Sequence, residues 1–108
     1  MQKNMPEIGV SGTPERGRMV VLELTVNNHP GVMSHICGLF SRRAYNLEKI
    51  LCLPGEEGTI SRMWLQVDEE EKLEQVVKQL EKLADVREVI FYPKGYELFA
   101  GIERMLAA

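Results

Sequence analysis

The stretch that decides the fold is "TVNNHPGVMSHICGLFSRRAYNLEKI", residues 25–50. It begins at the end of an alternating apolar run, crosses a polar turn with a proline and a glycine, and continues with apolar residues at helical spacing. These apolar residues share one helix face: Val32, Ile36, Leu39 and Phe40. The pattern predicts a strand, a turn, a helix and the start of a second strand.

The rest of the chain extends this order to βαββαβ. We expect strands over 19–27, 46–54, 59–67 and 85–92, and helices that begin near residues 32 and 73. "GEEG", residues 55–58, predicts a hairpin loop between the second and third strands. Two right-handed crossovers around a central hairpin give a ferredoxin-like α+β sandwich, with a four-stranded antiparallel sheet and both helices on one face. The other face and the two edge strands then need partners.

We divide the chain of 108 residues into three segments. Residues 1–18, rich in glycine and proline, predict a flexible tail. Residues 19–93 form the folded domain. Residues 94–108 form a helical extension, with a short helix over 96–107.

Composition restricts the class of protein. The net charge of −3 argues against a nucleic acid or an anionic membrane as partner. No apolar run approaches the roughly 18–20 residues of a membrane span, and no secretory signal is visible. The two cysteines, Cys37 and Cys52, are expected to be reduced thiols in a cytoplasmic protein.

No catalytic or metal-binding pattern stands out, and we expect no catalytic residues and no metal ligands. The histidines and Cys37 are spaced by six and two residues, which matches no recognised zinc pattern. Solvated histidines are the favoured interpretation. A small metal or redox protein remains one hypothesis, with four candidate residues: His29, His35, Cys37 and Cys52.

The polar turn favours two interpretations. The first N–H groups of a helix lack internal partners and attract a small carboxylate. Gly31 lets a ligand approach the backbone, and Asn28 offers both donors and an acceptor. The local pattern alone favours ordinary capping of the helix over binding of an amino acid.

The third strand carries Arg62 and Trp64. If Met63 and Leu65 face the helices, Arg62 and Trp64 face away, and an exposed tryptophan beside an arginine is typical of a partner-binding anchor. In the opposite register Trp64 belongs to the core. We favour the exposed alternative.

Residues 27–54 resemble the ACT-domain signature of the small regulatory subunits of acetohydroxyacid synthase, also called acetolactate synthase. The residues that follow the family pattern are Asn28, Gly31, Ser34, Gly38, Leu39, Phe40, Arg43 and the segment 45–48. The resemblance covers about 19–92, so the folded domain over 19–93 is interpreted as an ACT domain. "ILCLP", residues 50–54, is similar to the short, single-domain type of isozyme I.

The resemblance implies a non-catalytic subunit that binds and activates a large catalytic subunit and confers feedback inhibition by branched-chain amino acids, chiefly valine. Thiamine diphosphate, magnesium and FAD are expected on the catalytic subunit and none on this chain. A free-standing ACT-domain amino-acid sensor that acts on another enzyme or regulator is the alternative.

The resemblance also implies a homodimer that pairs edge strands, with the effector between the two chains. The turn of one chain then supplies six effector-binding residues: Asn28, His29, Pro30, Gly31, Val32 and Met33. Asn46 and Leu47 close the pocket from the other chain. His29 and Pro30 depart from the acidic residue and the serine or proline that many relatives have, so polar recognition is expected to differ there.

Overall fold

A computed structural model describes residues 19–93 and 97–107. Along these ranges the elements are β1 (Met19–Asn27), α1 (Val32–Arg42), β2 (Leu47–Pro54), β3 (Ile60–Asp68), α2 (Leu73–Lys82), β4 (Val86–Tyr92) and α3 (Leu98–Ala107). The predicted βαββαβ order with a terminal helix is confirmed. The tail predicted over 1–18 lies outside the described residues, as do residues 94–96 of the predicted extension.

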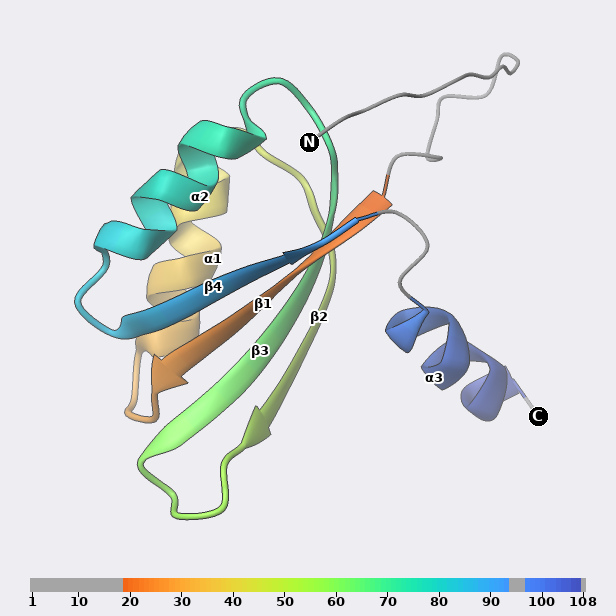
Figure 1. Cartoon of the computed structure of the whole chain (residues 1–108), viewed down its shortest axis with the longest axis horizontal. Helices are drawn as coiled ribbons and strands as arrows, with labels where there is room; N and C mark the ends of the chain where they lie inside the picture. The colour runs from red at the N-terminus through yellow and green to blue at the C-terminus, as the bar shows by residue number, and fades with distance from the viewer. Residues whose placement is uncertain (1–18, 94–96, 108) are drawn as a thin grey trace.

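The strands form one sheet in the order β2-β3-β1-β4, and each neighbouring pair is antiparallel. Figure 1 shows α1 and α2 side by side on one face of this sheet. The predicted ferredoxin-like fold is therefore confirmed. β2 and β4 are the edge strands, and β3 and β1 lie between them. Most residues of β1 are buried.

The main core lies between the sheet and helices α1 and α2. Alternate residues of β1 enter it because successive side chains of a strand point to opposite faces. Leu22 and Leu24 are completely buried, and so are Ile36 of α1 and Leu80 of α2. The helical spacing that predicted α1 therefore describes the face that packs on the sheet.

Helix α1 ends in a Schellman motif, a left-handed turn that satisfies its last carbonyl groups. The N–H of Tyr45 donates to the carbonyl of Phe40 at 2.9 Å, and the N–H of Ala44 donates to that of Ser41 at 3.0 Å. The rings of Phe40 and Tyr45 pack edge to face, with centroids 5.9 Å apart. Tyr45 also donates its hydroxyl hydrogen to the carbonyl of Asp68, which attaches this turn to the end of β3.

Ala44 occupies the left-handed position of the motif, with φ +54°. An L-residue pays roughly 1–2 kcal/mol there, and glycine avoids most of that cost but loses more entropy on folding. We expect Ala44→Gly to raise the free energy of unfolding by roughly 0.5–1 kcal/mol, measured by urea denaturation. Ala84→Gly is the matched control, because Ala84 is an exposed turn residue without a positive φ. Equal destabilisation by both changes would contradict the assignment of strain to Ala44.

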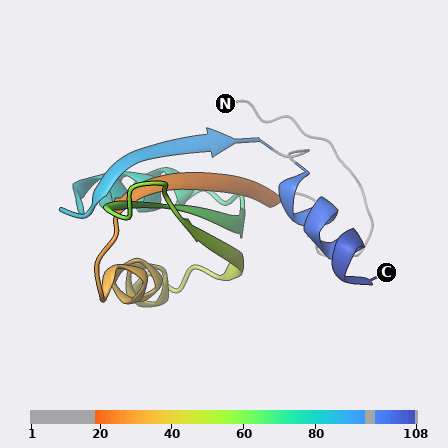
Figure 2. The ribbon, with the colours of Figure 1, turned by 90° about the horizontal axis from the view of Figure 1, so that it is seen from below.

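Helix α3 packs on the sheet face that α1 and α2 leave open. Phe99 is buried against Val21 and Trp64, with Leu51 and Tyr92 at the margin of this second cluster. Figures 1 and 2 both show α3 apart from the other two helices. An exposed ion pair joins it to the edge strand, with Nζ of Lys49 3.0 Å from Oε2 of Glu103.

The predicted register of β3 is right, but the predicted exposure of Trp64 is wrong. Trp64 does lie on the face opposite Met63 and Leu65, yet only 8% of its surface is exposed. The physical reason is α3, which covers the indole with Phe99. Arg62 keeps about half of its side chain exposed, and its guanidinium carbon lies 5.0 Å from the centroid of the Trp64 ring.

A buried carboxylate lies in the same sheet face. Glu23 is only 4% exposed, and it accepts hydrogen bonds from Nε of Arg62 at 2.9 Å and from the hydroxyl of Tyr92 at 2.9 Å. Burial raises the pKa of Glu23, but these hydrogen bonds and the charge of Arg62 outweigh it, so the pKa is lowered. Glu23 therefore remains ionised near neutral pH and joins β1 to β3 and β4.

Candidate functional site

The candidate site is the turn that connects β1 to α1. The N–H of Val32 donates to the carbonyl of His29 at 3.3 Å, and the N–H of His35 donates to that of Gly31 at 2.9 Å. Gly31 is the N-cap residue of α1, with φ +91°. A Cβ on Gly31 would meet no atom within 4 Å. Backbone conformation, rather than crowding, is therefore the reason for a glycine at this position.

No side chain caps the start of α1, and its first turn carries no acidic residue. The cap at this turn is therefore Gly31 itself, without a side-chain hydrogen bond. The first-turn N–H groups and the positive end of the helix dipole suit a small carboxylate. Val32 at this end is buried, whereas Met33 is 42% exposed, so an apolar contact is available beside the N–H groups.

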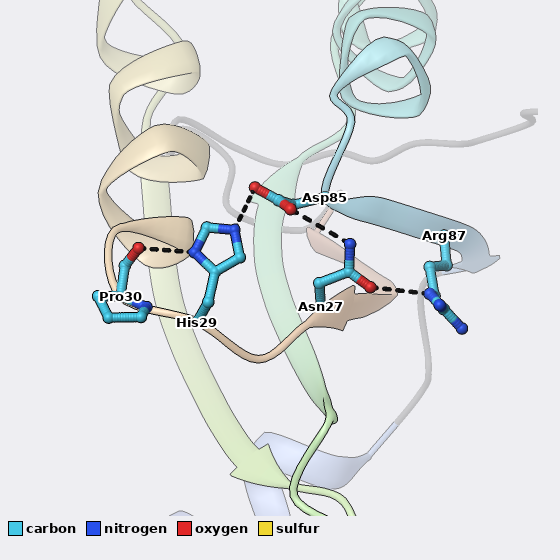
Figure 3. Close-up of polar contacts among 5 residues, drawn as sticks. All are labelled: Asn27, His29, Pro30, Asp85 and Arg87. Atoms are coloured by element: carbon cyan, nitrogen blue, oxygen red, sulfur yellow. Dashed lines mark hydrogen bonds and ion pairs between the residues drawn. The ribbon is translucent and has the colours of Figure 1, made fainter.

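His29 connects the turn to the start of β4, as Figure 3 shows. Its Nε2 lies 2.7 Å from Oδ2 of Asp85, and its Nδ1 lies 2.7 Å from the carbonyl oxygen of Pro30. The contacts with Pro30 and Asp85 raise the pKa of His29. The pKa of Asp85 is lowered, chiefly by a hydrogen bond from Asn27 and further by His29. The pair therefore favours the charged form of both groups.

Asn28 connects the turn to the loop between β2 and β3. Its side-chain Nδ2 donates to the carbonyl of Gly58 at 3.0 Å, and its backbone N–H donates to that of Thr59 at 3.0 Å. An asparagine side chain has two donors and a carbonyl acceptor. One hydrogen bond to Gly58 therefore leaves capacity for a ligand.

Asn46 and Leu47 lie at the opposite end of the sheet. Leu47 pairs with Val67, which in turn pairs with Val20 at the start of β1. The turn follows the other end of β1, where Asn27 pairs with Ile60. A single chain therefore does not bring the two predicted halves of the effector site together.

Arg62 and Trp64 are also separate from the turn. They lie on the sheet face that α3 covers, whereas α1 packs on the other face. The partner-binding candidates and the effector candidates therefore occupy different faces of the domain.

The residues of the metal hypothesis are dispersed over the turn, α1 and β2. His35 is exposed on α1, and Cys37 and Cys52 are half-buried on α1 and β2. Within residues 19–93 and 97–107, no three His, Cys, Asp or Glu side chains are grouped to hold a metal ion. Burial raises the pKa of Cys52, which makes its thiolate less available as a ligand or nucleophile.

The helices of the described ranges are short. A membrane-spanning helix needs about 18 or more mostly apolar residues, and the longest described helix, α1, has 11.

A four-stranded antiparallel sheet with two helices on one face, and a glycine at the N-cap of the helix after the first strand, is the ferredoxin-like arrangement of the class of ACT domains. Within that class, the chain belongs to the family described as "AHAS small subunit-like ACT domain", which it matches over residues 22–88. AHAS denotes acetohydroxyacid synthase. The resemblance in the sequence is thus confirmed, and the matched range contains the whole turn.

Relatives of known sequence and of known structure support the same family assignment. The chain is 57% identical over 70 residues to the acetolactate synthase isozyme 1 small subunit of Escherichia coli K12, covering 65% of this chain and 73% of the relative. It is 44% identical over 70 residues to the isozyme 3 small subunit, covering 64% of this chain and 43% of that one. The crystal structure of the acetolactate synthase small subunit of Thermotoga maritima has a TM-score of 0.62 at 35% identity, with 68% of this chain and 47% of that chain covered.

The His29–Asp85 pair is the feature of this site that sequence analysis missed. The two residues are far apart in the sequence, and neither belongs to a recognised motif. A signal was available, however, because the predicted fold pairs β1 with β4 in antiparallel fashion. Residues that follow β1 therefore lie beside residues that precede β4, and an aspartate before the fourth strand is a candidate partner for a histidine after the first.

Proposed function

We propose that this chain is a non-catalytic regulatory subunit of acetolactate synthase. It binds the thiamine-diphosphate-dependent catalytic subunit, raises its activity and makes it sensitive to feedback inhibition by branched-chain amino acids, chiefly valine. The observation that carries the proposal is membership of the AHAS small-subunit family over 22–88. We assign thiamine diphosphate, magnesium and FAD to the catalytic subunit, and we expect both subunits to act together in the cytoplasm.

The start of α1 has the chemistry to bind an amino acid. The α-carboxylate of the amino acid is expected at the first-turn N–H groups of α1. Its ammonium group is expected beside the side-chain carbonyl oxygen of Asn28. Burying a valine-sized side chain contributes roughly 1.5–3 kcal/mol, and each charge-assisted hydrogen bond contributes roughly 1.5–3 kcal/mol. After the cost of association, a dissociation constant in the micromolar to millimolar range is reasonable, about −8 to −4 kcal/mol. That range suits the sensing of a metabolite.

A homodimer would complete this site. β2 is an edge strand, and its Ile50 and Leu53 are 38% and 47% exposed. When two copies pair their β2 strands about a two-fold axis, the strands run antiparallel. Asn46 and Leu47 of a second copy then move to the end of the sheet where the turn lies. Because the effector contacts both chains, its binding is expected to tighten the dimer.

The effector site is tested by calorimetric titration with valine, leucine and isoleucine. In Asn28→Ala we expect binding to weaken roughly twofold to tenfold, because a hydrogen bond at the site contributes about 0.5–1.5 kcal/mol. Gln75→Ala, at an exposed residue of α2, is the matched control and should bind as the wild type does. Unchanged binding in Asn28→Ala would move the effector away from this turn.

The partner is tested by co-purification with the catalytic subunit of acetolactate synthase. A regulatory subunit is retained by that protein. A chain that binds valine but is not retained would instead support the free-standing sensor.

A further inference from the structure

The ring of His29 lies between two hydrogen-bond acceptors. Nδ1 faces the carbonyl oxygen of Pro30 at 2.7 Å, and Nε2 faces Oδ2 of Asp85 at 2.7 Å. A carbonyl and a carboxylate donate no hydrogen bond, and a neutral imidazole carries only one N–H. Both contacts are therefore hydrogen bonds only when both ring nitrogens are protonated. This geometry selects the imidazolium form of His29.

Asp85 is anchored independently of His29. Its Oδ1 accepts a hydrogen bond from Nδ2 of Asn27 at 3.2 Å, and its backbone carbonyl accepts one from the N–H of Asn27 at 2.8 Å. Oδ1 of Asn27 in turn accepts from Nε of Arg87 at 2.8 Å. Figure 3 shows this chain of contacts from β4 to the turn. Asp85 is thus a fixed point on the sheet, and His29 attaches the turn to it.

Three charged or titratable groups are connected to His29 through these contacts. They are Asp85 before β4, Arg87 in β4, which bonds to Asn27, and His35 in α1. Asp85 contacts the ring directly. His35 acts on Asp85, whose pKa it helps to lower.

We propose that His29 and Asp85 are positioning residues of the effector site, and that protonation of His29 strengthens effector binding. The inference rests on the proposed function, because the turn that this pair holds is the turn expected to take the effector's carboxylate. Protonated His29 joins Pro30 to Asp85 and so fixes the backbone that leads into Gly31 and α1. The neutral ring retains only one of these two hydrogen bonds. The turn then loses either its attachment to Asp85, before β4, or the contact of His29 with Pro30 inside the turn.

The pH range over which the ion pair is intact follows from the pKa shifts of His29 and Asp85. The pKa of His29 is raised above its ordinary value of about 6.5, so its two bonds are complete below that value and are lost as pH rises through the folded-state pKa. The pKa of Asp85 is lowered from about 3.9, so its contribution is lost only in more acidic solution. The pair is therefore complete in weakly acidic solution and opens as the pH rises through the raised pKa of His29.

Calorimetric titration of the full chain with valine, from pH 6 to pH 8.5, tests this coupling. We expect the affinity to fall roughly threefold to tenfold as pH rises, the equivalent of one hydrogen bond. In Asp85→Asn the fall should move to lower pH, because the ring loses its charged partner. In His29→Gln the affinity should be low and independent of pH. The chain has two histidines, so His35→Gln is the matched control and should keep the wild-type profile.

An NMR titration of the two histidine rings gives a readout that needs no effector. We expect the pKa of His29 to lie above 6.5 and to fall in Asp85→Asn. A His29 pKa that Asp85→Asn leaves unchanged, or a wild-type pH profile in His29→Gln, would overturn the inference. Valine binding that does not vary with pH overturns this inference alone. Absence of valine binding at every pH overturns the proposed function and the coupling with it.

Discussion

Phe99→Ala is expected to release α3 from the sheet and to expose Trp64. Phe99 is the one buried residue of α3 within its described range. The ion pair between Lys49 and Glu103 joins side chains that are 38% and 57% exposed, and such pairs contribute only about 0–1 kcal/mol. A helix of 10 residues is marginal in water without tertiary packing. Loss of the aromatic anchor should therefore undo the docking of the whole helix.

Two measurements test whether α3 is released in Phe99→Ala. Truncation of a buried phenylalanine costs roughly 3–5 kcal/mol, so the free energy of unfolding in urea should fall by an amount in that range. Trp64 is the only tryptophan of the chain, and its fluorescence emission should shift to longer wavelength as the indole meets water. Met105→Ala is the matched control, because Met105 is on the same helix and 76% exposed. An unshifted emission spectrum in Phe99→Ala would show that α3 does not cover Trp64.

Gly31→Val is expected to weaken valine binding roughly tenfold or more. A β-branched residue is strongly disfavoured at the positive φ of Gly31, and the left-handed region costs an L-residue roughly 1–2 kcal/mol. Each 1.4 kcal/mol is about tenfold in affinity. We expect the backbone around residue 31 to shift and so relieve this strain. That shift points the first N–H groups of α1 away from the effector's carboxylate.

Gly38→Ala is the control for this change. Gly38 lies inside α1, where alanine is the better helix former, and the nearest atom to a new Cβ is the flexible end of the Arg42 side chain at 3.3 Å. Valine titrated into Gly38→Ala should bind as it does to the wild type. Wild-type affinity in Gly31→Val would show that the conformation of this turn does not control effector binding.

The sheet and its main core were predictable from local patterns. Alternation in β1 identifies the face that carries Leu22 and Leu24, and helical spacing identifies Ile36. Each signal lies within a single element, β1 of 9 residues or α1 of 11 residues, so periodicity is enough to reveal it. The same reasoning correctly placed Trp64 on the opposite face of β3.

The features that sequence analysis missed depend on contacts between distant segments. Phe99 of α3 covers Trp64, and no local sequence pattern around Trp64 predicts this contact. The partner of His29 is Asp85, which only the pairing of β1 with β4 brings near. The turn of the candidate site was predictable because its residues are consecutive. The ion pair between His29 and Asp85 was not, because it joins segments that are far apart in the sequence.

The most direct test of the account is reconstitution of the catalytic subunit of acetolactate synthase with this chain, over a range of valine concentrations. We predict that the chain raises the activity of the catalytic subunit and that valine inhibits the mixture more strongly than the catalytic subunit alone. Equal activity and equal inhibition by valine, with and without the chain, would contradict the account.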